Sequence, residues 1–147
     1  RNVIPNFIYW SMQNKSLPLT GTGDETRDFT YVLDLVQGLI KAAFYDDAIG
    51  KAFNLASGKE TKIKDMIEMV CKSTGNTTPI TKFPPRKWDT KKRLLASIEL
   101  AGNLIDYKPI VSFEDGLNEN FKWFSNNWNE VQLSADFPAG MSSAVRK

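Results

Sequence analysis

A short basic segment between Lys82 and Arg93 is the most concentrated group of charges in the sequence. It contains six cationic residues and a single acid, Asp89, so its local net charge is +5, while the whole chain carries only +2. Such a segment attracts anions: a phosphate, a pyrophosphate or a nucleic-acid backbone. A basic loop that simply contacts water has the same composition, so charge alone leaves both interpretations open.

Arg27 is the second cation whose position suggests chemistry. It follows a turn that contains Gly21 and Gly23, and it precedes an apolar stretch. The turn is not a phosphate loop, because it lacks the full Gly-x-Gly-x-x-Gly pattern and no helix follows directly. The plainer interpretation of Arg27 is a salt bridge to Asp24, Glu25 or Asp28.

Several kinds of catalytic and metal site are excluded by residue counts. The chain of 147 residues has no histidine, which rules out Ser–His and Cys–His nucleophile systems and every histidine-ligated metal. Its one cysteine, Cys71, rules out an internal disulfide and a thiolate zinc site. No Tyr-x-x-x-Lys pair occurs, and Tyr31, Tyr45 and Tyr107 lie in apolar patterns typical of core or interface residues.

The composition is that of a globular protein, with 41% hydrophobic and 24% charged residues. No apolar run approaches the roughly 20 residues that a membrane helix needs, so we expect no membrane contact and a cytoplasmic location. From the residues alone, the sequence predicts an anion-binding α/β protein.

Hydrophobic spacing predicts four longer helices. Ser112, with Asp115 three residues later, predicts the start of the last helix, and Thr61 is expected to cap the third, which should stop at Gly75. Cys71 falls on the buried stripe of the third helix and is expected to be a small core residue. The helices are predicted over Arg1–Asn14, Leu33–Tyr45, Lys62–Ser73 and Phe113–Trp128.

Short strands and one short helix are expected between these helices, so the class is α/β or α+β. A turn and a short helix are predicted within Leu94–Ile105. From Asn129 the periodicity fades, so residues 129–147 are expected to form a flexible tail. The strands are predicted over Leu17–Thr20, Asp28–Val32, Ala52–Ala56 and Pro79–Phe83.

The stretch from Gly21 to Asp34 resembles a known family signature. It reads Gly-Thr-Gly-Asp-Glu-Thr-Arg-Asp-Phe-Thr-Tyr-Val-Leu-Asp. This is similar to the Gly-x-Gly-x-x-x-Arg-Asp-Phe-x-x-Val-x-Asp stretch of the extended short-chain dehydrogenases/reductases, the NAD-dependent nucleotide-sugar epimerases and dehydratases. Leu33 departs from this pattern, because relatives usually have an acidic residue there.

Further segments resemble the same family in the same order. Residues 1–8 look like the segment that follows its Tyr-Gly-Pro turn, and Phe53–Gly58 resembles its Asn-hydrophobic-Gly-x-Gly strand end. Residues 86–89, Arg-Lys-Trp-Asp, resemble its Arg-x-x-Asp element, and residues 96–101 resemble its Ala-Asp-x-x-Lys-Ala helix start. The likeness covers about residues 1–128.

The resemblance implies a substrate-binding site for a nucleotide sugar. Arg27 and Arg86 match the two arginines that hold the diphosphate, which suits the two-pronged hydrogen bonding of a guanidinium group to phosphate. Asp89 matches an acid that contacts the ribose or orients the neighbouring arginine. The full set of matched positions is Asn2, Val3, Pro18, Thr20, Arg27, Arg86 and Asp89.

The resemblance also implies a chain that is the C-terminal portion of a Rossmann-type enzyme, mostly helices with short strands. Residues 1–128 would form the substrate-binding portion, and 33–56 would pack on a missing N-terminal dinucleotide-binding half. NAD(P) would bind to that half and not to this chain, which alone would be inactive. We expect a nucleotide-diphosphate sugar and the N-terminal half as partners, and possible self-association of the isolated chain.

Two other interpretations compete with this one. The basic segment could belong to a free-standing module that binds anions or nucleic acid, although a net charge of +2 is low for that role and no nucleic-acid partner is expected. The chain could also be a non-catalytic remnant that serves as a scaffold. Within the first interpretation, epimerisation, dehydration, decarboxylation and reduction all remain open, as do the sugar and the base.

Overall fold

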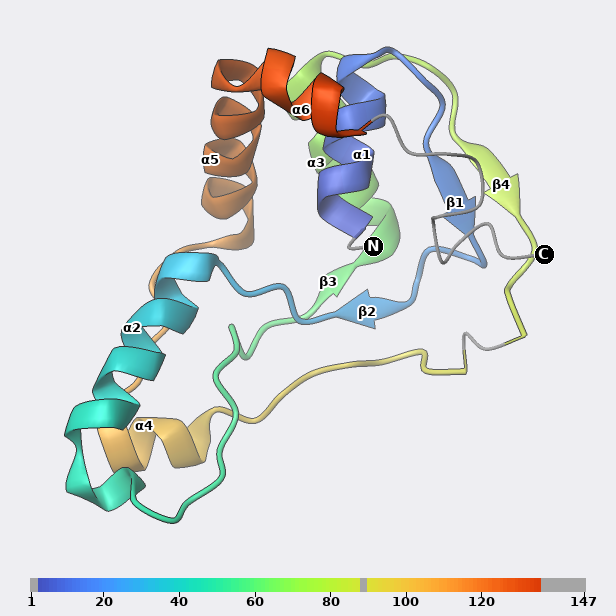
Figure 1. Cartoon of the computed structure of the whole chain (residues 1–147). Helices are drawn as coiled ribbons and strands as arrows, with labels where there is room; N and C mark the ends of the chain where they lie inside the picture. Colours follow the sequence, from blue (N-terminus) through green and yellow to red (C-terminus); the bar gives the residue numbers. More distant parts are fainter. Residues whose placement is uncertain (1–2, 88–89, 136–147) are drawn as a thin grey trace.

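The computed structural model describes residues 3–87 and 90–135, and two groups of elements are evident in it (Figure 1). The elements are α1 (Val3–Met12), β1 (Pro18–Thr20), β2 (Thr26–Arg27), α2 (Val32–Phe44), the 3-10 turn η1 (Asp46–Ala48), β3 (Thr61–Lys62), α3 (Ile63–Thr74), β4 (Thr81–Phe83), α4 (Glu99–Ile105), α5 (Phe113–Asn126) and α6 (Trp128–Ala135). Helices α1, α3, α5 and α6 lie with strands β1 and β4 in the larger group, and α2 and α4 form the smaller one.

Helix α3 is the centre of the larger group because α1 and α5 both pack against it. Its apolar stripe, Met66, Ile67 and Val70, is completely buried. The helix ends where predicted, at Gly75, whose φ of 72° is in the left-handed region that glycine tolerates. The prediction that Thr61 caps this helix is wrong. Helix α3 begins at Ile63, one residue later than predicted, so Lys62 takes the N-cap position, without a side-chain hydrogen bond.

Cys71 lies at the margin of this core, half-buried and packed against the larger cluster, in agreement with its predicted role. Burial raises the pKa of its thiol. Burial therefore favours the protonated thiol, which is less reactive than the thiolate.

Helix α5 begins as the sequence predicts. The Ser112 hydroxyl accepts a hydrogen bond from the Asp115 backbone N–H at 3.0 Å and donates one to the Asp115 carboxylate at 2.6 Å. The helix stops at Asn126, because the Asn127 side chain donates to the Trp123 carbonyl at 2.8 Å and the chain turns there. A new helix, α6, follows, so the first part of the predicted tail is helical, with Val131 buried.

The four strands form two separate two-stranded sheets. Strand β1 pairs with β4 in parallel, with Thr20 opposite Phe83. Strand β2 pairs with β3 in antiparallel fashion, with Arg27 opposite Thr61, and an isolated parallel bridge joins Thr26 to Arg93. The expected strands at Leu17–Thr20 and Pro79–Phe83 are therefore confirmed in shortened form.

Two other predicted strands are wrong. Residues 28–31 form no strand, since the Asp28 carboxylate binds backbone N–H groups of another segment and α2 already starts at Val32. Residues 52–56 form no strand within the described part of the chain, and Phe53 and Leu55 pack against the cluster that includes Ala101 and Ile105 of α4. A strand needs a partner strand, and residue preference alone cannot provide one.

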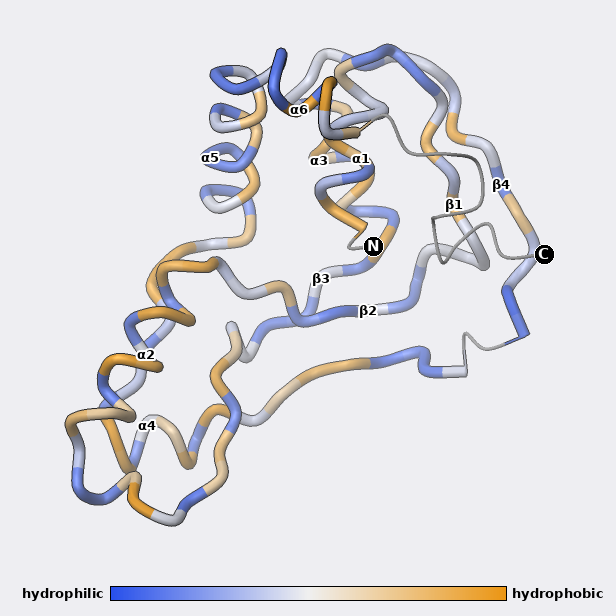
Figure 2. Tube along the Cα trace, in the orientation of Figure 1, coloured by the Kyte–Doolittle hydropathy of each residue, from blue (hydrophilic) through white to orange (hydrophobic). Residues whose placement is uncertain are grey.

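Helix α2 is amphipathic in the reverse of the usual sense. Its small and polar residues Asp34 and Gly38 are buried, while its large apolar residues, which recur along the helix in Figure 2, are exposed. An ordinary surface helix turns its apolar stripe toward the core. The outward residues are between 37% and 83% exposed and comprise Val32, Leu33, Leu35, Val36, Leu39, Ile40 and Phe44.

No helix that could cross a bilayer is found in residues 3–87 and 90–135.

Candidate functional site

Backbone hydrogen bonds join both ends of the basic segment to residues 21–26, which precede Arg27. At one end, the Gly21 N–H donates to the Phe83 carbonyl at 3.1 Å. At the other, the Thr26 N–H donates to the Lys92 carbonyl at 2.9 Å, and the Leu94 N–H donates to the Thr26 carbonyl at 3.2 Å. We call residues 20–27, 83–87 and 90–94, joined in this way, the basic frame. Figure 1 shows the chain leaving β4 and running back past β2 toward α4.

The turn inside this frame is held against the start of α3. Gly23 has a φ of +83°, and a Cβ atom there would lie 3.0 Å from Lys64 and 3.2 Å from Leu19, so only glycine fits. The Lys64 ammonium pairs with Asp24 at 2.7 Å and lowers the pKa of that carboxyl. The Glu25 carboxylate accepts from the Gly23 N–H at 2.9 Å. The glycines therefore shape a compact turn.

Arg27 does not form the salt bridge that the plainer interpretation expects. Asp24 is paired with Lys64, Glu25 binds the backbone of Gly23, and Asp28 binds other backbone groups. Within the described residues, no carboxylate lies at salt-bridge distance from Arg27, whose Nη1 instead donates to the Thr26 carbonyl at 2.7 Å. A half-buried guanidinium whose charge no described carboxylate balances is suited to an anionic ligand.

Asp28 holds the chain just beyond Arg27. Its Oδ1 accepts from the Ser57 N–H at 3.0 Å and from the Ser57 hydroxyl at 2.5 Å, and its Oδ2 accepts from the Gly58 N–H at 3.1 Å. A longer contact of 3.4 Å reaches the Ala96 N–H. This carboxylate ties three segments together and fixes where Arg27 leaves the backbone.

The other predicted residues lie in several parts of the molecule. Pro18 and Thr20 are half-buried in β1, so Thr20 lies within the basic frame beside Phe83. Arg86 is exposed and follows β4 closely, in the second segment of the frame. Val3 is the first residue of α1 and packs against the larger core cluster, away from these bonds.

Two of the predicted site residues, Asn2 and Asp89, lie outside the described residues. The structure thus pairs Thr20 with Phe83 and bonds Thr26, which precedes Arg27, to Lys92, while Arg86 follows β4 and Val3 lies on a separate element.

One cluster beside Arg27 has no signal in the sequence. Glu60 accepts two hydrogen bonds from the Arg93 guanidinium, each of 2.8 Å, and a third of 2.6 Å from the Thr26 hydroxyl. These bonds lower the pKa of the Glu60 carboxyl, chiefly through Arg93. In the sequence, Arg93 counted only as one cation of the basic segment and Glu60 stood in an unremarkable loop, so no local signal joined them.

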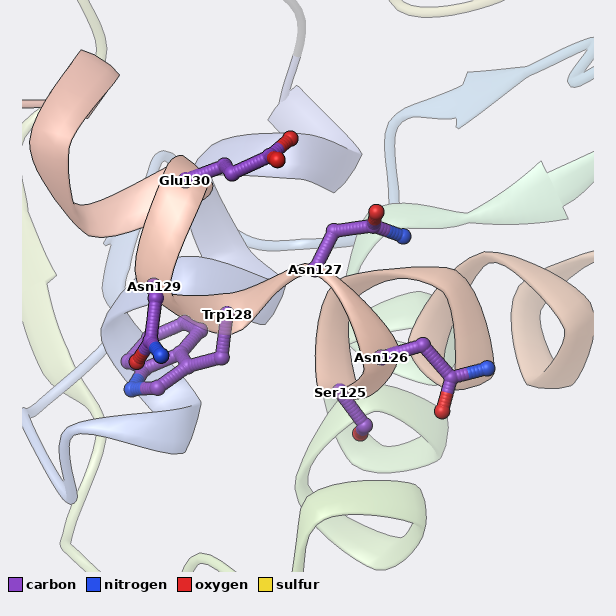
Figure 3. Close-up of a pocket in the computed structure, with 6 residues that line it drawn as sticks. All are labelled: Ser125, Asn126, Asn127, Trp128, Asn129 and Glu130. Carbon is purple, nitrogen blue, oxygen red and sulfur yellow. The ribbon is translucent and has the colours of Figure 1, made fainter.

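Two hollows lie elsewhere on the molecule. One, of about 330 Å³, lies between α1, residues 29–32 and α5, and its walls are mainly apolar. The other, of about 260 Å³, is at the corner between α5 and α6. Its six lining side chains come from consecutive residues and point in different directions (Figure 3). Neither hollow gathers groups that could catalyse a reaction.

Comparison with known families gives a match over residues 1–120 to the family described as GDP-mannose 4,6 dehydratase. The chain belongs to this family. It is thus a member of the extended short-chain dehydrogenases/reductases that act as NAD-dependent epimerases and dehydratases, as the Gly21–Asp34 stretch suggested. The α/β class, with helices predominating over short strands, is confirmed.

Solved structures of epimerases share this architecture. An epimerase, Mth375, from Methanothermobacter thermautotrophicus superimposes with a TM-score of 0.89 at 46% identity, over 91% of this chain and 40% of that one. The Bordetella bronchiseptica enzyme WbmF, solved in complex with NAD+ and UDP, gives a TM-score of 0.77 at 37% identity, over 90% of this chain and 39% of that one.

Among curated proteins, UDP-glucuronic acid decarboxylase 1 of Danio rerio is 28% identical over 99% of this chain and 34% of its own length. The chain thus spans about a third to two fifths of the relatives that it matches. The family members named here include an epimerase and a decarboxylase, so they share the architecture but not one reaction.

Proposed function

We propose that this chain provides the nucleotide-diphosphate-binding portion of an NAD-dependent nucleotide-sugar epimerase or dehydratase. The observation that carries the proposal is Arg27: it is half-buried, unpaired with any described carboxylate, and bonded into the same frame as the basic segment. Two negative charges on a buried diphosphate require cations with matched donors. The crystal structure of the relative WbmF with UDP supports this class of ligand.

Each part of the frame has a role in this proposal. Arg27 and Arg86 would hold the diphosphate from the two segments of the frame. Pro18 and Thr20 would lie along the base. Asn2 and Val3, at the start of the first helix, would meet the nucleotide, and Asp89 would contact the ribose or orient Arg86.

The inverted helix α2 supports the rest of the proposal. An apolar face of seven exposed residues needs a covering surface, and relatives are more than twice as long as this chain. We infer that residues 33–56 pack on a dinucleotide-binding part of the natural protein. NAD(P), which exchanges a hydride with the sugar in such an enzyme, would bind there, since this chain carries no dinucleotide loop. A soluble cofactor and a soluble sugar nucleotide suit the cytoplasmic location expected above.

A titration of UDP into arginine variants tests the proposed diphosphate clamp. In the natural protein that contains this chain, Arg27→Lys and Arg86→Lys should each weaken UDP binding by roughly 1.5–3 kcal/mol, because lysine keeps the charge but loses the planar pair of donors. Lys91→Ala is the matched control. As an exposed cation of the same segment outside the matched motif, it should cost less than about 1 kcal/mol.

The titration is run by calorimetry at two salt concentrations. A specific clamp keeps the difference between the arginine variants and the control at both. Equal losses in all three variants that shrink together with salt would mean that the segment acts only as a positive field, as in the alternative of a general anion- or nucleic-acid-binding module.

A further inference from the structure

We infer that Glu60 is a positioning residue for the proposed diphosphate site, acting on Arg27 through Thr26 and Arg93. This inference rests on the proposed function and adds a residue that lies outside all the matched motifs. Glu60 touches no part of the proposed ligand site itself. Its effect would come from holding two segments of the basic frame side by side.

The Glu60 carboxylate accepts three hydrogen bonds, two from Arg93 and one from Thr26. Oε1 accepts from Arg93 Nε at 2.8 Å and from the Thr26 hydroxyl at 2.6 Å, while Oε2 accepts from Arg93 Nη2 at 2.8 Å. The paired contacts are the two-pronged arrangement that gives an arginine–carboxylate pair its directionality. Both oxygens are therefore engaged, and the carboxylate joins the segment before β3 to β2 and to residue 93.

The backbone carbonyl of Thr26 connects these hydrogen bonds to Arg27. The Thr26 carbonyl accepts from two donors, the Leu94 N–H at 3.2 Å and Arg27 Nη1 at 2.7 Å. A shift of residues 92–94 away from β2 would remove the Leu94 donor from this carbonyl and so disturb the acceptor that holds the Arg27 guanidinium. The side chain of Glu60 is the only described link, apart from backbone bonds, between Arg93 and β2.

The charges of Arg93 and Arg27 fit the positioning role inferred for Glu60. Successive side chains of a strand point to opposite faces, so Thr26 can bind Glu60 while Arg27 points away from it. Glu60 thereby balances Arg93 and leaves Arg27 without a competing carboxylate. A carboxylate placed beside a phosphate-binding arginine would otherwise oppose an anionic ligand.

The test is a coupling measurement on UDP affinity in the natural protein that contains this chain. Glu60→Gln keeps the side-chain shape but places an amide donor against the Arg93 donors. The pair of hydrogen bonds between residues 60 and 93 is then lost. We expect UDP binding about tenfold weaker, equivalent to about 1.4 kcal/mol. In an Arg27→Lys background the same Glu60→Gln change should cost less than about twofold, because the residue through which Glu60 acts is already altered.

Glu119→Gln is the matched control, because Glu119 forms an exposed pair with Lys122 at 2.6 Å on α5 and should leave affinity unchanged. A Glu60→Gln loss of equal size in both backgrounds would overturn the inference, since a general effect on folding or charge does that. No loss from Glu60→Gln while Arg27→Lys still weakens binding would overturn it and leave the proposed function standing. An inert Arg27→Lys would overturn the proposed clamp itself.

If Glu60→Gln prevents folding, Thr26→Val removes one bond of the grip and is judged by the same coupling to Arg27→Lys. Thermal unfolding of every variant identifies those that remain folded.

Discussion

The Asp28 and Asp34 carboxylates bind backbone N–H groups rather than Arg27. Asp28 binds N–H groups of the 57–58 loop, and the buried Asp34 accepts from the Ile110 and Val111 N–H groups at 3.0 and 3.1 Å. A buried carboxylate is tolerated when such donors surround it. The Asp residues of the Gly21–Asp34 stretch thus join segments far apart in the sequence, and no described carboxylate pairs with Arg27.

Tyr107 offers a stability test at the level of one hydrogen bond. Its hydroxyl is buried and donates to the Ala56 carbonyl at 3.0 Å, and burial raises the pKa of the phenol. Tyr107→Phe should lower the free energy of unfolding by about 1 kcal/mol, because it leaves that carbonyl without its donor. Tyr45→Phe, at a tyrosine that is 42% exposed, is the control and should change stability by less than about 0.5 kcal/mol. Equal effects in urea titrations of the natural protein would contradict this role.

Sequence predicts the helices of this chain better than its strands. The start of α5 and the end of α3 follow from Ser112 and Gly75, which act on their own neighbours. Ala52–Ala56 has the residues of a strand, yet pairing depends on a neighbour that its own sequence does not encode. Thr61 is not the cap of α3, because this helix begins one residue later than predicted and Lys62 takes that position.

In the candidate site, too, sequence predicts the local features but not those that depend on tertiary contacts. The positions of Arg27 and Arg86 could be proposed from motifs, but the grip of Glu60 on Arg93 could not, since these residues are 33 positions apart and meet only through tertiary structure.

Helix packing gives a prediction in which one substitution has opposite effects in two helices. At Gly38 in α2, a Cβ atom would lie 2.7 Å from Leu55 and 2.9 Å from Tyr107, so Gly38→Ala should destabilise the protein by about 1–3 kcal/mol despite the better helix propensity of alanine. At Gly102 in α4, the nearest atom would be 3.7 Å away, so Gly102→Ala should stabilise by up to about 1 kcal/mol. Chemical unfolding of both variants decides it: stabilisation by both would show that α2 is not tightly packed there.

At the scale of the whole molecule, the apolar face of α2 governs how the isolated chain behaves. Leu39, Ile40 and Phe44 are 56%, 55% and 83% exposed on one helix. A soluble protein seldom leaves so large an apolar area open. If another part of the natural protein covers this face, the 147-residue chain on its own should self-associate or be loosely packed, and it should not bind NAD.

Light scattering and sedimentation measure this behaviour directly. Ile40→Lys should reduce the association of the isolated chain, whereas Lys72→Glu on the exposed surface of α3 should not. A compact, monodisperse monomer with a cooperative thermal transition, or measurable NAD affinity, would refute the prediction.

The parallel pairing of β1 with β4 also has a consequence for the order of folding. Ser16 and Pro79, next to this pair, are bonded across 63 residues, and the contacts at Thr20 and Thr26 reach about as far along the chain. Contacts of such long sequence separation form late, after local helices such as α3. The basic frame would therefore close in the last steps of folding. A nucleotide bound to it would recognise only molecules that have finished folding and would raise their population by mass action, so UDP could serve in refolding experiments as a reporter of the final step.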